Sequence, residues 1–164
     1  MNDIAIRNAE AYVVKHALRT TAQLGFGVHG NVYAVEDKVK GDRSAIKAHL
    51  ELAPYQRECV VYRRLKERGI TSVLGFHVPQ LLRTDDALRV IEMTIVTRPF
   101  VLDFAGAYLD ARPEFSQEVW EEWEAGKREQ FGSKWAKVRA IIDSFEGLGI
   151  YLADVTPSNV AFGD

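Results

Sequence analysis

The spacing of apolar residues divides the chain into a part rich in predicted strands and a part rich in predicted helices. Residues 3–18 repeat apolar side chains at close to every 3.6 residues, which predicts an amphipathic helix. Residues 20–50 contain three short runs typical of strands, separated by turns that carry glycine or charge. A second helix is predicted over residues 52–68. Its apolar stripe consists of Tyr55, Cys59, Tyr62 and Leu65.

The rest of the chain completes the strand-rich part and then turns helical. The runs at residues 79–84 and 87–96 have the composition of strands, and the polar pair between them predicts a tight turn. Beyond Pro99 the apolar period indicates helices, which we expect near residues 101–109, 117–131 and 134–146.

This order of elements predicts an α+β fold of two lobes. The first lobe, residues 1–96, would have an N-terminal helix, a five-stranded antiparallel sheet and one inserted helix. The second lobe, residues 97–164, would be small and helical. Two lobes of this size favour a cleft between them, which is a common place for a small-molecule site.

Composition narrows the class of protein. The chain has 164 residues, 47% of them apolar, and its single cysteine leaves no internal disulfide. It lacks the ~20-residue apolar run of a bilayer span and the pattern of a secretion signal, so we expect a cytoplasmic protein without a membrane partner. A net charge of −2 argues against a nucleic-acid partner. Residues 1–96 have 14 basic and 11 acidic side chains, so a bound anion is expected in this part of the chain rather than in residues 97–164.

A glycine-rich segment follows the first predicted strand. Gly25, Gly27 and Gly30, followed by Val32, form the pattern G-x-G-x-x-G-x-V. In a dinucleotide-binding turn these glycines would open a helix, but strand-forming residues follow here, which favours a strand–loop–strand hairpin. Such a loop can lie over a triphosphate, because glycine lets backbone amides approach the phosphate oxygens.

The next strand carries a lysine between apolar residues, in the sequence Ser44-Ala45-Ile46-Lys47. This segment resembles the V-A-I-K signature of the protein-kinase family. The resemblance implies that Lys47 pairs with ATP phosphates and that Glu58, on the following helix, holds Lys47 in position. Glu51 is an alternative partner, although it precedes the helix.

The fifth strand and a late loop extend the resemblance. The segment after the strand corresponds to the kinase hinge, which implies adenine contacts at Glu92 and Met93, with Val32 and Ala45 packing on the ring. The late loop, Asp154-Val155-Thr156-Pro157-Ser158-Asn159, resembles the kinase catalytic loop D-L-x-P-x-N. There Asp154 would accept the hydroxyl proton of the acceptor and Asn159 would bind Mg²⁺.

The chain also departs from the kinase pattern. Leu152 and Ala153 stand where His-Arg usually precedes the aspartate. The second metal-binding aspartate of kinases normally lies at the far end of a hairpin that begins just after the asparagine. Here the sequence ends at Asp164, which is the one carboxylate after Asn159 that could substitute as a metal ligand.

Each motif has a plainer structural interpretation as well. The glycines could form an ordinary hairpin turn, Lys47 and Glu58 could be solvated, and Asp154 and Asn159 could cap turns. Four motifs in kinase order over residues 24–159 favour the chemical interpretation.

The sequence therefore predicts a minimal, C-terminally abbreviated protein-kinase-like fold with ATP and Mg²⁺ as cofactors. We expect a phosphotransferase that moves the γ-phosphoryl group of ATP to a hydroxyl acceptor, either a protein or a small molecule. The alternative is a pseudokinase, a nucleotide-binding or protein-interaction module without turnover. A short second lobe with bared apolar helix surface also suggests a homodimer.

Overall fold

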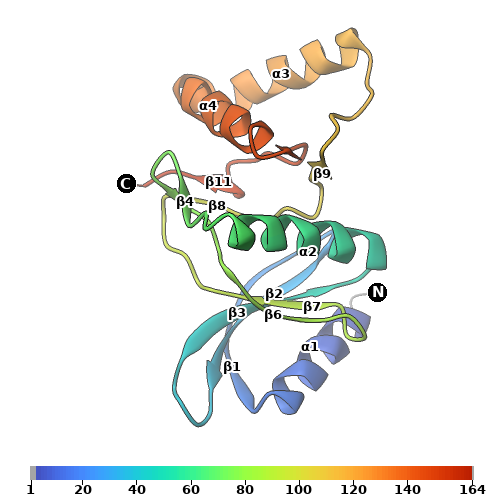
Figure 1. Ribbon diagram of the computed structural model, residues 1–164, viewed down its shortest axis with the longest axis vertical. Helices are drawn as coiled ribbons and strands as arrows, with labels where there is room; N and C mark the ends of the chain where they lie inside the picture. Colours follow the sequence, from blue (N-terminus) through green and yellow to red (C-terminus); the bar gives the residue numbers. More distant parts are fainter. Residues whose placement is uncertain (1–2, 164) are drawn as a thin grey trace.

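A computed structural model describes residues 3–163 and shows an α+β fold. The predicted five-stranded sheet is present, every neighbouring pair is antiparallel, and the order is β1-β2-β3-β7-β6 (Figure 1). Its strands are β1 (Leu18–Gly27), β2 (Gly30–Asp37), β3 (Arg43–His49), β6 (Leu81–Asp85) and β7 (Val90–Met93).

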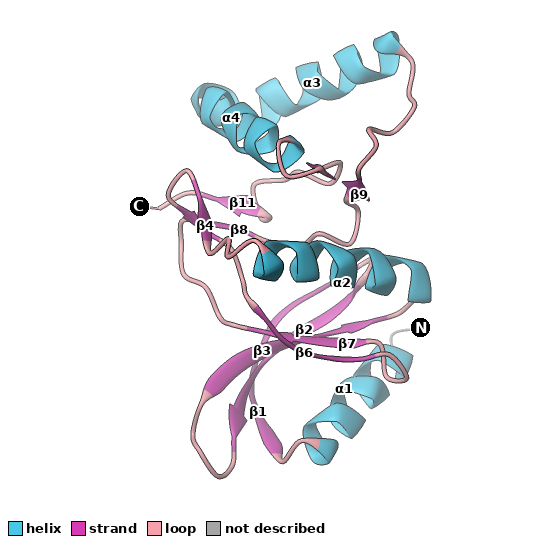
Figure 2. Ribbon diagram, in the orientation of Figure 1, coloured by secondary structure: helices cyan, strands magenta, loops and turns pink. Residues whose placement is uncertain are grey.

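Two helices cover the two faces of this sheet. Helix α1 (Asp3–Lys15) lies on one face and α2 (Leu52–Glu67) on the other (Figure 2). Because successive side chains of a strand point to opposite faces, Ile46 and Ala48 of β3 pack with α1, whereas Ala45 packs in the core that contains α2. The same alternation turns Lys47 toward the α2 side.

The second lobe contains α3 (Gln117–Phe131), the short 3₁₀ helix η1 (Gly132–Lys134) and α4 (Trp135–Glu146), close to the predicted helices. Helix α4 packs one apolar face inward, and the buried residues of that face are Trp135, Val138, Ile141, Ile142 and Phe145. The helix expected near 101–109 is absent: this segment instead forms the short strands β8 (Phe100–Val101) and β9 (Tyr108–Leu109) at its two ends. Asp103 has a φ of 68°, which a right-handed helix does not allow.

Short strands that the sequence did not predict join the two lobes. β4 (Ser72–Val73) and β5 (Phe76–His77) form a four-stranded sheet with β8 and β11 (Val160–Ala161), in the order β11-β8-β5-β4. A separate pair is formed by β9 and β10 (Ile150–Tyr151). The core around α2 continues without interruption into the second lobe, so the boundary at residue 97 does not separate two cores.

An ion pair fastens α2 to the second lobe. The Arg64 guanidinium donates to both carboxylate oxygens of Asp110, at 2.7 and 2.8 Å. Gly149, with a φ of 75°, makes room for this pair, because a Cβ there would lie 2.6 Å from Asp110 Oδ1. Within residues 3–163, no helix is both long and apolar enough to cross a bilayer.

Candidate functional site

A cleft of about 890 Å³ lies between the five-stranded sheet and the second lobe. It is lined by the glycine-rich loop, by β3 and α2, by the segment after β7, by residues 100–103 and by the loop 154–159. The three side chains on which the sequence prediction depends most, Lys47, Asp154 and Asn159, all line this one cleft although they are far apart along the chain. The structure therefore brings these three predicted residues together.

Lys47 sits at the bottom of the cleft between two carboxylates. Its Nζ lies 2.9 Å from Oε2 of Glu58 and 2.8 Å from Oδ1 of Asp103, and the side chain is nearly buried. Burial alone would lower the pKa of Lys47, but the two carboxylates outweigh burial and raise the pKa above its ordinary value. The ammonium therefore stays charged and its position is fixed from two sides.

Glu58 is the partner of Lys47 that the sequence predicted, and it is fully buried. Its Oε2 also lies 2.6 Å from Nε2 of His49, and its Oε1 accepts the backbone N–H of Phe104 at 3.2 Å. Burial raises the pKa of Glu58, yet Lys47 and His49 outweigh it and lower the pKa to about 2. Glu51 precedes α2 as expected, and its side chain does not line the cleft.

This buried carboxylate makes a testable contribution to stability. Because folding lowers the pKa of Glu58 from 4.5 to about 2, its stabilisation is complete above pH 4.5 and is lost as pH falls toward 2. We expect Glu58→Gln to reduce the free energy of unfolding by about 2 kcal/mol at pH 7. Urea unfolding should show that the difference in the free energy of unfolding between the wild type and Glu58→Gln decreases between pH 4.5 and pH 3.

The surface carboxylate Glu36 provides a matched control, because it pairs at 2.9 Å with the exposed Arg19. Glu36→Gln should change the stability by less than about 0.5 kcal/mol. If Glu58→Gln reduces the free energy of unfolding equally at pH 7 and pH 3, Glu58 is not a charged carboxylate with a lowered pKa.

Asp103 is the site residue that sequence analysis missed. It was placed within an expected helix, whereas in the structure it follows strand β8 and reaches Lys47. Its carboxylate is 27% exposed toward the cleft. The one signal in the sequence was an aspartate placed between the apolar runs 100–102 and 104–105, which is unusual for an amphipathic helix.

Asp154 and Asn159 lie at the two ends of one loop that lines the cleft. Asn159 Nδ2 donates to the backbone oxygen of Asp154 at 3.1 Å, which fixes the two residues relative to each other. Asp154 itself is exposed. Burial lowers the pKa of Lys127 on α3, and the negative charge of Asp154 partly offsets this effect.

The three glycines of the loop have different roles. A Cβ on Gly25 or Gly27 would meet no atom within 4 Å, so both leave open space at the cleft. Gly30 instead has a φ of 150°, and a Cβ there would lie 2.1 Å from the backbone oxygen of Ala48. Gly30 is thus required by the pairing of β2 with β3, which is a structural role.

The apolar part of the cleft agrees with the prediction at three positions and differs at one. Val32, Ala45 and Met93 line it, together with residues 94–96. Glu92 does not: it lies on the α1 side of the sheet, where its carboxylate accepts hydrogen bonds from Tyr12, Ser44 and Arg83. The Glu92 side chain is therefore not a cleft residue, because strand alternation turns neighbouring side chains to opposite faces, and the predicted hinge contact of its backbone stays a prediction. Strand β7 also ends at Met93, before the predicted Val96.

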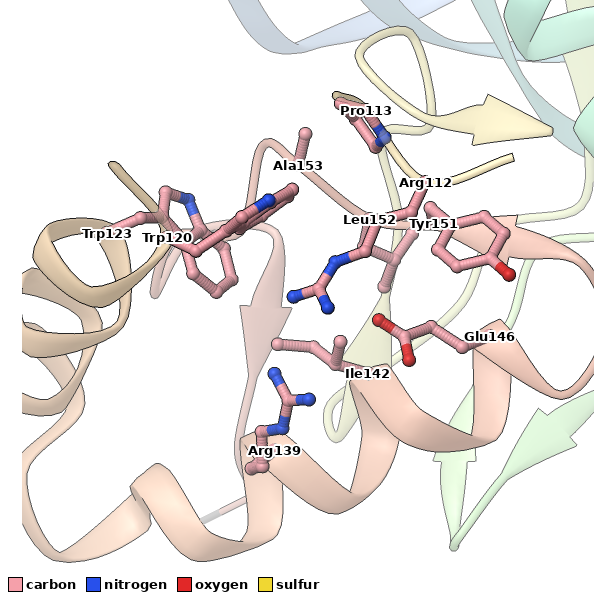
Figure 3. A pocket seen from close by; sticks show the side chains of 10 residues that line it. All are labelled: Arg112, Pro113, Trp120, Trp123, Arg139, Ile142, Glu146, Tyr151, Leu152 and Ala153. Atoms are coloured by element: carbon pink, nitrogen blue, oxygen red, sulfur yellow. The ribbon is translucent and has the colours of Figure 1, made fainter. Parts of the chain in front are cut away.

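A second, much smaller pocket lies between α3, α4 and the segment that leads to Asp154. The side chains of Arg112 and Arg139 point into it from different elements, and Arg112 stacks 4.1 Å above the ring of Trp120 (Figure 3). Its volume of about 10 Å³ accommodates roughly one water molecule. The large cleft is therefore the candidate site.

The protein oxygens in the cleft are too few to bind Mg²⁺ alone, but they could bind it together with the phosphate oxygens of a nucleotide. Asp164, a predicted metal ligand, lies outside the described residues. Among residues 3–163, no group of three or more His, Cys, Asp and Glu side chains could hold a metal ion. Asp103, Asp154 and Asn159 nevertheless line one cleft, and Mg²⁺ commonly combines one or two protein oxygens with phosphate oxygens and water.

Comparisons of this chain with protein-family models, curated proteins and solved structures found no match.

Proposed function

We propose that this protein is an ATP-dependent phosphotransferase with a protein-kinase-like arrangement of its site. The observation that carries the proposal is the convergence of Lys47, Asp154 and Asn159 on one cleft. A buried lysine held by carboxylates and an exposed aspartate beside an asparagine are the groups that phosphoryl transfer needs. The size of the cleft also suits a nucleotide.

The first lobe would bind the nucleotide. Adenine would enter the apolar part of the cleft, between Val32, Ala45 and Met93. The triphosphate would extend under the loop that contains Gly25 and Gly27, where the absence of Cβ atoms lets backbone amides approach its oxygens. Lys47 would donate to the phosphates while Glu58 keeps its ammonium in place.

The loop 154–159 would carry out the transfer. The hydroxyl oxygen of the acceptor attacks the γ-phosphorus, its proton passes to the Asp154 carboxylate, and the bond to the β–γ bridging oxygen breaks, so that ADP leaves. Asn159 and neighbouring carboxylates would hold Mg²⁺, which neutralises phosphate charge when bound. Asp154 suits a general base because it is exposed at the cleft, where a hydroxyl can reach it.

Nucleotide binding is the first property to test. Mg·ATP should raise the melting temperature of the protein, because a ligand that binds only the folded state stabilises it. Lys47→Met should lower the affinity for Mg·ATP at least about tenfold, since it removes a charged hydrogen bond to phosphate. Calorimetric titration measures both proteins directly.

The exposed Lys40, in the turn between β2 and β3, gives a control of the same chemistry. Lys40→Met should bind Mg·ATP as the wild type does. If no nucleotide stabilises the wild-type protein, the proposal is wrong. If ATP binds but no ADP is released with any hydroxyl acceptor or water, the pseudokinase alternative is favoured instead.

A further inference from the structure

We infer that Asp103 is a metal ligand of this protein and supplies, beside Asn159, the carboxylate that binds the Mg²⁺ of Mg·ATP. The inference rests on the proposed function and adds to it a residue and a chain order that the sequence did not predict. The contacts around Asp103 provide four separate arguments.

Strand pairing places the segment that carries Asp103 next to Asn159. Strand β8 pairs antiparallel with β11, with Val101 opposite Val160. Past the end of this ladder, the backbone N–H of Leu102 donates to the backbone oxygen of Asn159 at 2.9 Å. Asp103 is the next residue, so the pairing of the two strands places it beside Asn159 at the wall of the cleft.

The backbone that follows Asp103 is held by buried contacts. Phe104 is fully buried, its ring packs edge-on against Tyr62 of α2 at 5.3 Å, and its N–H donates to Glu58. The Arg57 guanidinium binds the backbone oxygen of Ala105 at 3.0 Å. A metal ligand has to be held in this way, because loss of side-chain freedom on binding reduces affinity.

The Asp103 carboxylate has one oxygen available for a metal ion. Oδ1 of Asp103 accepts a hydrogen bond from Lys47, whereas Oδ2 has no hydrogen-bond partner among residues 3–163. The side chain is partly exposed at the cleft. Carboxylate and amide oxygens are ligands that Mg²⁺ prefers, so Asp103 and Asn159 together offer a suitable pair.

The charges around Lys47 also favour a metal ion at Asp103. Lys47 is already matched by the buried Glu58, so Asp103 adds negative charge where the ATP phosphates would lie. A carboxylate that only held the lysine would repel the triphosphate. A divalent cation between Asp103 and the phosphates removes this repulsion, which gives the second carboxylate at Lys47 a purpose.

This assignment also explains why the sequence pointed to Asp164, and not to Asp103, as the metal-binding aspartate. The kinase resemblance implies an aspartate after Asn159, on the strand that pairs with residues just beyond it. Here the strand that pairs with β11 is β8, which comes about 60 residues earlier in the chain. The strand that carries the aspartate precedes Asn159 in this chain, whereas in the kinase pattern it follows the asparagine. A search for the kinase order of motifs therefore does not find Asp103.

The test compares ATP binding with and without Mg²⁺ in the wild type and in Asp103→Asn. In calorimetric titrations, the wild type should bind Mg·ATP at least tenfold more tightly than ATP in excess chelator. Asp103→Asn should lose this preference, to less than about twofold. Its affinity for metal-free ATP should be unchanged or higher, because a negative charge near the phosphates is gone.

A second readout follows the metal itself. With the non-hydrolysable β,γ-imido analogue of ATP, Mn²⁺ bound to the wild-type complex should give an electron paramagnetic resonance spectrum distinct from that of Mn²⁺ on the free nucleotide. In Asp103→Asn the spectrum should return to the free-nucleotide form. Asp42→Asn, an exposed change in the turn between β2 and β3, serves as the control and should behave as the wild type.

The outcomes separate this inference from the proposed function. If Asp103→Asn keeps the Mg²⁺ preference, or loses affinity for metal-free and Mg·ATP equally, Asp103 only positions Lys47 and the inference is wrong. If the wild type binds neither form of ATP, the proposed function itself fails.

Discussion

Asp154→Asn should lower the rate of ADP formation by about a thousandfold while the affinity for Mg·ATP stays within about twofold of the wild type. General-base catalysis by a positioned side chain contributes roughly 10²–10⁴-fold to a rate, and asparagine cannot accept the proton. Affinity should persist because Asp154 is exposed and forms no ion pair with Lys47, whose carboxylate partners are Glu58 and Asp103. Asparagine also keeps the backbone oxygen that accepts the Asn159 amide.

The measurement is steady-state ADP release, with water or a panel of small hydroxyl compounds and proteins as acceptors. Asp143→Asn is a suitable control, because Asp143 is an exposed residue of α4 whose carboxylate pairs at 3.1 Å with Arg139 outside the cleft. The control should release ADP at the wild-type rate. Equal rates for Asp154→Asn and the wild type would exclude Asp154 as the base.

The first lobe was predictable because its elements are long enough to show a period. Five strands and the helix α2 each carry a repeated apolar pattern, and the buried stripe of Tyr55, Cys59, Tyr62 and Leu65 is confirmed. The central strands β3 and β7 are buried on both faces, and α2 buries its apolar stripe, whereas β1 is mostly exposed beyond Leu18. The local pattern and the packing therefore agree.

The second lobe was less predictable because part of it is held by strands of two residues. A strand such as β8 is too short to display alternation, and its hydrogen bonds come from β5 and β11, which are distant in sequence. The apolar residues of 100–105 were therefore interpreted as a helix. The same error hid Asp103, whose role depends on a long-range pairing and not on its neighbours in the chain.

The glycine motif shows a different limit of sequence reasoning. A pattern identifies which positions are glycine but not what each glycine does. Gly25 and Gly27 face open space at the cleft, whereas Gly30 faces the backbone of β3. Two glycines of this motif thus leave space for a ligand, and the third is required by the fold.

Gly30→Ala should therefore reduce the free energy of unfolding by about 4 kcal/mol, the largest stability change expected for a methyl group in this loop. Overpacking costs about 1–3 kcal/mol and an unfavourable backbone conformation a similar amount. Both apply here, because Gly30 has a φ of 150° and its Cβ would lie 2.1 Å from the Ala48 backbone oxygen. Relief would require β2 to separate from β3 at the first pair of their ladder, Gly30 with His49.

Gly27→Ala is the matched control, because Gly27 is the β1 residue that pairs with Gly30 in the same hairpin. It should leave the stability within about 1 kcal/mol, since its Cβ meets nothing, yet it should weaken Mg·ATP binding by crowding the phosphates. Urea unfolding and nucleotide titration of both variants separate the two roles. Equal stability of Gly30→Ala and Gly27→Ala would refute the structural role of Gly30, and an unfolded Gly30→Ala beside a folded Gly27→Ala would support it.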